Sequence, residues 1–423
     1  MRKIAFYINK PTLPNRNYSD LELGNPGLPG SEYEFLLVSQ LLDKRNNDLS
    51  IYLLANFEGN FPHSNVVKVS DLESCCKVCE EFEIKTLVVD IKYFDKKVMD
   101  QYNQLDYIIW AHNIMSIKQL TLLCELDYIK HIICVGREMM ELFRDHPVSW
   151  KTNYIYNIFP VIEKNYYEEV MQNRDSHNVV YMGCLIEEKG FHVLAKAWKK
   201  ILEQVPDAQL YVIGNGRLYD KDAPLGKYGQ ASPEYENMFM PYVTDVEGNV
   251  LESVHFMGVM GNEKYDIISK CKVGVPNPNS TPETFCISGV EMQLYGAIVT
   301  APFIPAFIDT FANHKYIYRH ASDLTQYVVS ALLSQNDYDK TYAFISNQFG
   351  IETNITRWEM LFNGNLQIEP ISCYRYRFKG LKNIMLYLKR ILPMLNRIPI
   401  IEKWYNAYYM KTNQRERILM PNQ

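Results

Sequence analysis

Glu283 and Glu291 are the residues whose type and spacing most directly suggest chemistry. Glu291 lies about two turns inside a helix predicted over residues 286–295, given about 3.6 residues per turn. A carboxylate within an apolar helix usually has a partner, because burying an unpaired charge is costly. Its two oxygens can also accept hydrogen bonds from the two hydroxyls of a vicinal diol. Glu283 stands just before the helix, where a carboxylate can accept backbone N–H bonds or face a bound ligand.

Three elements must position these glutamates: a loop over 276–282, the helix over 286–295, and a short apolar strand over 297–301 that follows Gly296. Together they read PNPNSTPETFCISGVEMQLYGAIVTA. Spacing alone leaves a second interpretation open, that of two surface glutamates near a helix start.

This stretch resembles the donor-site signature of the retaining GT-B glycosyltransferases of the family 4-like type, which use sugar nucleotides. In that family Glu, seven residues and Glu lead through a small-residue helix into Gly and an apolar strand, and Glu283, Glu291 and Gly296 match. The resemblance implies that Glu283 lies beside the reacting sugar and that Glu291 holds the ribose hydroxyls. It also assigns donor contacts to Thr284, Phe285 and Cys286.

A second part of the same pattern lies over residues 179–198, VVYMGCLIEEKGFHVLAKAW. The family's usual form is Gly-Arg-Leu, a short loop and Lys-Gly, and its Arg and Lys bind the pyrophosphate. Gly183 and Lys189 match, but Cys184 takes the place of the arginine. Cysteine cannot supply guanidinium donors, so Lys189 and helix N-termini must meet the phosphate charge.

The missing arginine leaves several outcomes open. Arg217 and Lys264 are candidate substitutes, and weaker donor affinity or lost catalysis are alternatives. Gly214 is expected to make a tight turn at the end of a strand. By the resemblance, the loop after Gly258 lies near the nucleotide base.

The N-terminal segment leads from a strand over 4–8 through a long loop to a helix. Residues 24–35 read GNPGLPGSEYEF, in which Ser31 is a candidate N-cap and Glu34 its capping-box partner. Free N–H groups and the helix dipole can bind an anion there. In the resembled family a Gly-rich loop closes over the donor at this place, which would involve Gly27, Gly30 and Ser31, while a plain surface loop is the alternative.

Apolar strands alternate with helical patterns along both halves, which predicts parallel α/β sheets. The resemblance implies a GT-B fold, with two Rossmann-like domains facing across a cleft. We expect an acceptor domain over 1–160, joined by C-terminal helices at about 380–423, and a donor domain over 161–379. Ligands of such sheets bind beyond the carboxyl ends of strands, which selects His112, at the end of the strand over 107–111. In related enzymes a histidine there contacts the donor sugar.

Composition excludes several other classes of function. The net charge of −5 gives no general case for nucleic-acid binding. The nine cysteines do not form a disulfide framework in a chain of this length, and the C-x-x-C of Cys76 and Cys79 lacks a second pair of zinc ligands. The D-x-D at Asp220 and Asp222 sits in a turn-rich loop, so we expect no metal ion. Residues 218–251 are expected to be a polar insertion with few helical stretches. No run has the length of a signal peptide core or a membrane span, so a cytoplasmic protein is expected.

Residues 374–417 interleave basic and apolar residues with aromatic ones. They are typical of the closing helix of GT-B proteins or of a segment that docks on an anionic membrane surface, at its inner face.

The combined reading is a metal-independent retaining hexosyltransferase. Its donor would be a UDP or GDP sugar, its acceptor a sugar or lipid-linked hydroxyl, and no cofactor would be needed. Cell-surface polysaccharide synthesis is the expected setting. One alternative is a sugar-nucleotide epimerase on the same fold. The other is a non-catalytic carbohydrate-binding scaffold, which the replacement of the usual arginine by Cys184 makes credible.

Overall fold

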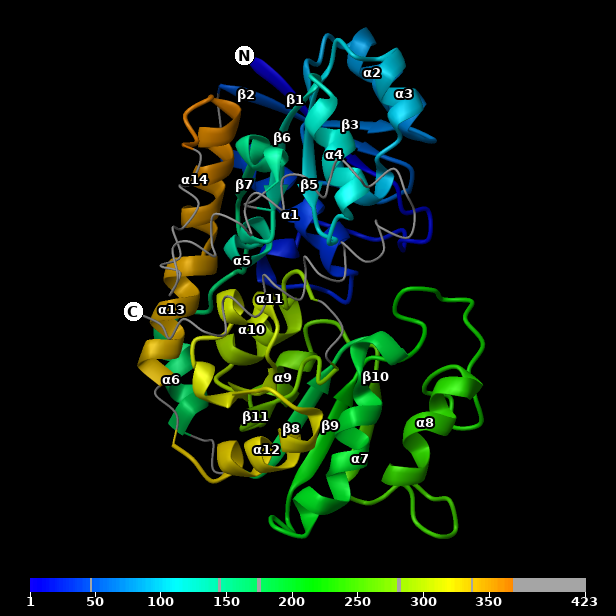
Figure 1. The fold of residues 1–423 in the computed structure, drawn as a ribbon, viewed down its shortest axis with the longest axis vertical. Helices are drawn as coiled ribbons and strands as arrows, with labels where there is room; N and C mark the ends of the chain where they lie inside the picture. The colour runs from blue at the N-terminus through cyan, green and yellow to red at the C-terminus, as the bar shows by residue number, and fades with distance from the viewer. Residues whose placement is uncertain (46–47, 144–145, 173–175, 280–282, 336–337, 368–423) are drawn as a thin grey trace, which may run out of the picture. The chain divides into compact units, whose positions relative to one another are not determined.

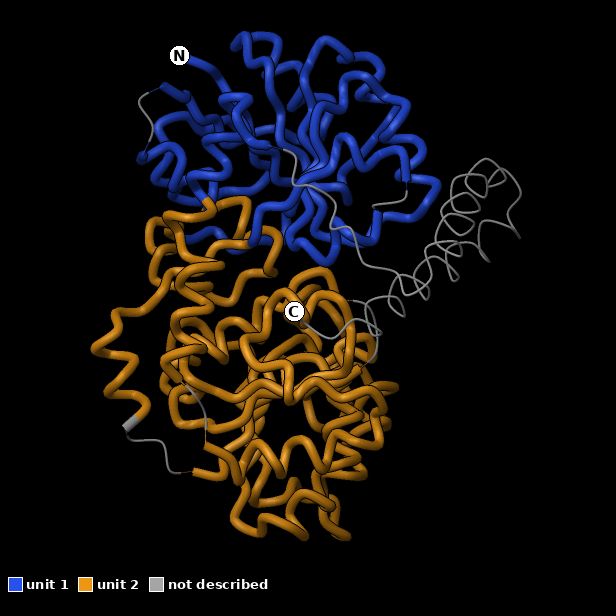
Figure 2. Tube along the Cα trace, turned by 60° about the vertical axis from the view of Figure 1, so that its left-hand side comes forward, with its two compact units in different colours: residues 1–16, 38–156, 355–423 blue, residues 17–37, 157–354 orange. Residues whose placement is uncertain are grey.

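The computed structural model describes residues 1–367 apart from 46–47, 144–145, 173–175, 280–282 and 336–337. The described chain divides into two compact units (Figure 2). The first contains residues 1–16, 38–156 and 355–367, and the second contains 17–37 and 157–354. The division near residue 156 lies close to the predicted boundary at 160, but residues 17–37 group with the second unit. The helices expected over 380–423 lie outside the described residues.

The first unit is built on a sheet whose described strands are all parallel, in the order β3-β2-β1-β4-β5-β6-β7 (Figure 1). Its core strands are almost continuously apolar, as expected for a sheet covered on both faces. The strands are β1 (Arg2–Ile8), β2 (Leu49–Ala55), β3 (Asn65–Lys68), β4 (Thr86–Asp90), β5 (Asp106–Ala111), β6 (Ile129–Cys134) and β7 (Thr152–Tyr154).

The helices of the first unit connect and cover these strands. They are α2 (Leu72–Glu81), α3 (Lys96–Gln101), α4 (Ile117–Glu125), α5 (Arg137–Glu141) and most of α14 (Ile351–Phe362), with α1 (Gly30–Arg45) beginning in the second unit. Helix α2 begins with a capping box between Asp71 and Ser74 and buries Cys75, Cys76 and Cys79 as free thiols. All three cysteines thus pack as small side chains on the buried face of one helix.

The second unit has a parallel sheet in the order β10-β9-β8-β11-β12. Its strands are β8 (Asn178–Met182), β9 (Gln209–Ile213), β10 (Val254–Gly258), β11 (Val273–Gly274) and β12 (Ile298–Val299). A short pair, β13 (Ala301–Pro302) and β14 (Ile317–Tyr318), stands apart from it. The strand order reverses between β8 and β11, which is the place where ligands bind on such sheets.

Helices surround this second sheet. They are α6 (Lys164–Gln172), α7 (Phe191–Leu202), α8 (Pro233–Val243), α9 (Lys264–Ile268), α10 (Ile287–Leu294), α11 (Pro305–Thr310), α12 (Leu324–Leu332) and α13 (Tyr338–Phe349). Helix α10 and the loop before it carry the two glutamates singled out in the sequence. The sequence thus predicted this helix within one residue at each end.

Helix α8 corrects the expectation of few helical stretches over 218–251. It begins with Ser232, whose hydroxyl accepts from the Tyr235 N–H, and with Pro233 in the first turn. The buried Glu236 carboxylate accepts N–H groups of the preceding loop, from Tyr228, Gln230 and Ala231. The helix therefore organises the insertion around one carboxylate. Its second proline, Pro241, had weakened the helical pattern in the sequence.

Among the described residues, no helix combines the length and apolar character needed to cross a bilayer.

Candidate active site

Lys189 and Glu283 form an ion pair within the second unit. The Nζ of Lys189 lies 2.7 Å from Oε2 of Glu283, and the side chains are 26% and 14% exposed. Lys189 ends a 3-10 turn at Glu187–Lys189, in the connection from β8 to α7, and Glu283 follows β11. The amide of Asn277 donates to the same Oε2 at 3.1 Å. Glu283 Oε1 receives no hydrogen bond from a described residue, so one oxygen stays available to a ligand.

The charge of Lys189 is maintained by its partner. Burial alone would lower the pKa of Lys189, but the neighbouring Glu283 carboxylate outweighs it, and the pKa is raised above its usual value. Lys189 is therefore a cation at any pH at which the protein would work. A partly exposed cation beside a carboxylate suits a ligand that carries both anionic groups and hydroxyls.

Three glycines meet at the carboxyl ends of β8, β9 and β10. The Gly183 N–H donates to Ile213 O, and the Gly214 N–H donates to Gly258 O. Gly214 has φ +113°, and a Cβ there would lie 2.1 Å from the Gly183 carbonyl oxygen. The backbones thus approach closely at the carboxyl ends of these three strands, where a side chain at position 214 would not fit.

Cys184 lies beside this edge and is fully buried. Its thiol donates to Asn215 O at 3.3 Å. Burial raises the pKa of Cys184 to about 11, although backbone N–H groups of Tyr219 and Leu218 and the charge of Lys189 act in the opposite direction. The thiol is therefore neutral near pH 7 and adds no positive charge to the site.

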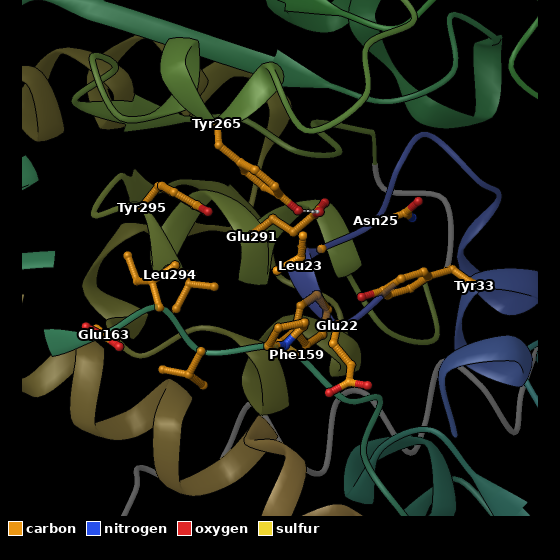
Figure 3. A pocket seen from close by; sticks show the side chains of 14 residues that line it. Glu22, Leu23, Asn25, Tyr33, Phe159, Glu163, Tyr265, Glu291, Leu294 and Tyr295 are labelled. Atoms are coloured by element: carbon orange, nitrogen blue, oxygen red, sulfur yellow. Dashed lines mark hydrogen bonds between the residues drawn. The ribbon is translucent and has the colours of Figure 1, made fainter. Parts of the chain in front are cut away.

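Glu291 belongs to a second, more deeply buried ion pair. Its Oε1 lies 2.8 Å from the Nζ of Lys264, with side chains 6% and 5% exposed. The Tyr265 hydroxyl donates to the same Oε1 at 2.9 Å, and the two side chains point toward each other (Figure 3). No described residue donates to Oε2, so a diol could still reach this carboxylate.

The structure gives the two candidate phosphate partners other contacts. Lys264 donates to the Asn25 carbonyl oxygen at 3.0 Å in addition to its pairing with Glu291. The Nε of Arg217 donates to the Ala223 carbonyl oxygen at 2.9 Å, on the surface. Both cations thus have protein partners, whereas Lys189 pairs with Glu283.

The glycine-rich loop over 24–30 packs against α9, α10 and the segment after β10. Gly24 has φ +125°, and a Cβ there would lie 2.3 Å from the Tyr265 hydroxyl oxygen. A Cβ at Gly27 would lie 3.1 Å from Met260 O, and one at Gly30 would lie 2.5 Å from Ile287 Cδ1. The loop therefore belongs to the same site as Glu291.

The predicted capping box at this loop is wrong. Helix α1 begins at Gly30, which places Ser31 inside the helix, where its hydroxyl donates to Glu32. The Glu34 carboxylate instead accepts the N–H of Ile158 at 2.9 Å. Glu34 is fully buried, and burial raises its pKa well above the usual value. Tertiary contacts thus replaced the local hydrogen bonds that the sequence pattern indicated.

A cavity of about 240 Å³ adjoins Glu291 (Figure 3). It is lined by aromatic rings, among them Tyr33, Phe159 and Tyr265, and by the carboxylates of Glu22 and Glu163. The Tyr265 ring also stacks on Tyr295, with centroids 4.4 Å apart. These walls suit a flat ring that carries hydroxyl groups.

Thr284, Phe285 and Cys286 follow Glu283 and lead into helix α10. Cys286 is its N-cap residue and is buried, which raises the pKa of its thiol to about 12. Phe285 stacks on Phe159 at 6.0 Å between centroids. Thr284 links Phe285 to Glu283. Their packing fixes where α10 begins.

His112 belongs to the first unit, directly after β5. Its Nδ1 lies 3.3 Å from Oδ2 of Asp90, the last residue of β4. Sequence reasoning missed Asp90. Its signal was a carboxylate at the end of the apolar strand read as KTLVVDI, next to the strand that carries His112.

We compared the sequence and the fold with those of known proteins. No protein-family model matches the sequence. An uncharacterised glycosyltransferase of Methanocaldococcus jannaschii is 24% identical over 313 residues, which cover 64% of this chain and 75% of that protein.

Solved structures resemble the fold. The Anabaena protein HepE, solved in complex with UDP and glucose, has a TM-score of 0.61 at 16% identity, covering 86% of this chain and 100% of that one. Sucrose-phosphate synthase from Thermosynechococcus elongatus has a TM-score of 0.61 at 13% identity, with coverage of 86% and 99%. A glycosyltransferase from Rickettsia africae has the same TM-score at 11% identity, with the same coverage.

Proposed function

We propose that this chain, which is 24% identical over 313 residues to a glycosyltransferase and shares its fold with solved glycosyltransferases, transfers a hexose from a nucleotide-diphosphate sugar to an acceptor hydroxyl, with retention of anomeric configuration and without a metal ion. The observation that carries this proposal is the pair formed by Lys189 and Glu283 where the strand order reverses. A cation and a carboxylate with one open oxygen together suit a phosphate and a sugar.

The chemistry would be stabilisation of the leaving group. Negative charge grows on the departing phosphate, and a preorganised cation offsets it in the transition state. Lys189 would supply that charge, and Glu283 would hold the sugar hydroxyls. Glu291 would accept from the ribose diol through Oε2, while Lys264 and Tyr265 fix Oε1. His112 would contact the sugar.

The donor would be a uridine diphosphate hexose. HepE has been solved with UDP and glucose and with UDP-glucose, which supports a donor of this kind. The cavity beside Glu291 offers aromatic walls to a nucleoside. The acceptor would be a sugar or a lipid-linked hydroxyl in cell-surface polysaccharide synthesis, at the cytoplasmic side of the membrane.

Residues 374–417, proposed as a contact with anionic lipid, lie outside the described residues. Sedimentation with anionic vesicles, comparing the full chain with a chain that ends at Cys373, tests this part. Equal binding by both chains would remove it.

The decisive experiment measures release of UDP from UDP-glucose, and of GDP from GDP-mannose, by the wild type and by Glu283→Ala. We expect Glu283→Ala to lose most of the turnover while nucleotide binding persists, since Lys189 remains. Full turnover by the variant contradicts the assignment. Product analysis without acceptor separates transfer from epimerisation, and calorimetry with UDP and GDP identifies a non-catalytic scaffold, which need bind neither.

A further inference from the structure

The carboxylate of Glu283 has one oxygen to which the second unit supplies two donors. Oε2 of Glu283 lies 2.7 Å from the Nζ of Lys189 and accepts the side-chain amide of Asn277 at 3.1 Å. Each oxygen of an ionised carboxylate has about two lone-pair sites, so these two donors fill Oε2. No described residue donates to Oε1. A further donor, such as a sugar hydroxyl, would therefore bind at Oε1.

The side chain of Asn277 is oriented by a hydrogen bond of its own. Asn277 follows β11 at the carboxyl end of that strand and is 2% exposed. Its Oδ1 accepts the N–H of Asn279 at 3.3 Å. Because this oxygen is used as an acceptor, the group that faces Glu283 is the NH₂ group, which donates. The carboxylate thus meets a buried donor whose direction is fixed.

The loop that carries Asn277 is joined to the turn that carries Lys189. The amide of Asn279 donates to Glu187 O at 3.0 Å. Gly190, with φ +73°, packs so closely on the loop that a Cβ there would lie 2.6 Å from the Asn279 nitrogen. The segments that follow the neighbouring strands β8 and β11 therefore support each other, and together they hold both donors of Oε2 in place.

Two other titratable groups act on the ion pair of Lys189 and Glu283, and both are uncharged near pH 7. Burial raises the pKa of the Tyr219 hydroxyl, in the segment after β9. Burial also raises the pKa of the Cys286 thiol, at the start of α10, to about 12. Asn277 thus adds a second donor to Glu283 without changing the charge of the site.

We propose that Asn277 is a positioning residue that, together with Lys189, fixes the carboxylate of Glu283, so that Oε1 alone accepts hydroxyls of the donor sugar. Without the amide, the carboxylate could turn and offer either oxygen. A misplacement of about 1 Å in a group that positions a substrate can cost about a hundredfold in rate. The inference rests on the proposed function and assigns Asn277 a part in it.

The variant Asn277→Asp separates the donor from the shape of the side chain. The introduced carboxyl group has the size of the amide, but it can donate only while it is protonated. Two carboxyl groups in hydrogen-bond contact raise the pKa of one of them, because like charges repel at this distance. In this variant the donor is therefore present at low pH and is lost as the pH rises. The asparagine amide donates at every pH.

The test measures kcat for hydrolysis of UDP-glucose to UDP and glucose between about pH 5 and about pH 8, with each variant compared with the wild type at the same pH. We expect Asn277→Asp to be slower by about tenfold or more at the high end, the scale of one hydrogen bond to a charged group, and to approach the wild type as the pH falls. Asn277→Ala should be slower by a similar factor at every pH.

The matched control is Asn237→Asp, which introduces the same charge on the exposed face of α8 and should match the wild type at every pH. Two results would overturn the inference. One is a ratio of Asn277→Asp to wild type that does not change with pH. The other is wild-type kcat in Asn277→Ala.

A second measurement does not depend on how the variants fold. In crystals of the wild type soaked with UDP-glucose, we expect hydroxyls of the glucose at Oε1 of Glu283, with the amide of Asn277 still on Oε2. A glucose hydroxyl on Oε2 in place of Asn277 contradicts the inference. Failure of the proposed function looks different: the wild type would then neither release UDP from UDP-glucose nor bind UDP at any pH.

Discussion

At the scale of single residues, the proposed donor site would differ from that of the resembled family in offering one cation to the diphosphate rather than two. Cys184 occupies the place of the arginine, is neutral, and is held among backbone groups of the loop after β9. Lys264 is committed to Glu291. The affinity for the diphosphate would therefore depend mainly on Lys189.

We predict that Lys189→Met weakens UDP binding about tenfold to a hundredfold, since a hydrogen bond to a charged group contributes about 1.5–3 kcal/mol. Lys200→Met, on the exposed face of α7, is the matched control and should bind as the wild type does. Isothermal calorimetry measures both. Unchanged affinity in Lys189→Met would mean that the diphosphate lies elsewhere.

Glu34 leads to a prediction about pH. Its pKa in the folded chain is raised by burial, whereas in the unfolded chain it is about 4.3. Above about pH 4.3 the folded chain keeps this proton and the unfolded chain loses it, so stability falls as pH rises toward the folded pKa. Glu34→Gln carries no such proton and still accepts from Ile158.

The free energy of unfolding of Glu34→Gln, relative to wild type, should therefore increase between pH 5 and pH 8, by up to about 1.4 kcal/mol per pH unit. Urea titrations at several pH values measure it. The exposed Glu203→Gln should show no such trend, and a difference that is flat with pH in Glu34→Gln would contradict the prediction.

At the scale of elements, the sequence predicted the buried strands well because their apolar runs are nearly continuous. Strands β1 and β5 lie within two residues of the ranges predicted for them, 4–8 and 107–111. The edge strand β3, with alternating exposure, was missed.

Some site residues could be predicted from local sequence patterns, and others could not. Glu283, Glu291 and Lys189 lie in local sequence patterns with fixed spacing, so they could be found. Tyr265 reaches Glu291 only through a contact between segments 26 residues apart, and Asp90 meets His112 only through the pairing of two strands, which no local pattern reports. The sequence shows the type of each residue, but it does not show which residues become neighbours in the folded chain.

The loop over 24–30 gives a prediction of its own. Gly24 has φ +125° and ψ 174°, a conformation open almost only to glycine. In Gly24→Ala the added Cβ also meets the Tyr265 hydroxyl. We expect a loss of about 2 kcal/mol or more in stability and faster amide exchange over residues 17–30.

Gly229→Ala is the control, because Gly229 also has positive φ but a Cβ there meets open space. It should lose only about 1 kcal/mol. Equal losses in the two variants would show that the packing on Tyr265 contributes nothing.

At the scale of the whole molecule, each unit has its own sheet and core, so nucleotide should stabilise the unit that binds it. At 100 times its Kd, a ligand that binds only the folded form adds about 2.7 kcal/mol. We predict that UDP raises the temperature at which residues 157–354 unfold and become susceptible to proteolysis. Protection of residues 38–156 instead would contradict the placement of the donor site.

The second unit is not one continuous piece of chain. Residues 17–37 make three contacts with the rest of this unit. The Glu34 carboxylate accepts the Ile158 N–H, the Asn25 carbonyl accepts from Lys264, and Gly24 packs against Tyr265. A fragment that begins at residue 157 would therefore lose the acceptor of the Ile158 N–H and the carbonyl that accepts from Lys264. Anyone who wishes to study nucleotide recognition in isolation must graft the early segment back, and engineering that exchanges donor halves between enzymes must carry both pieces together.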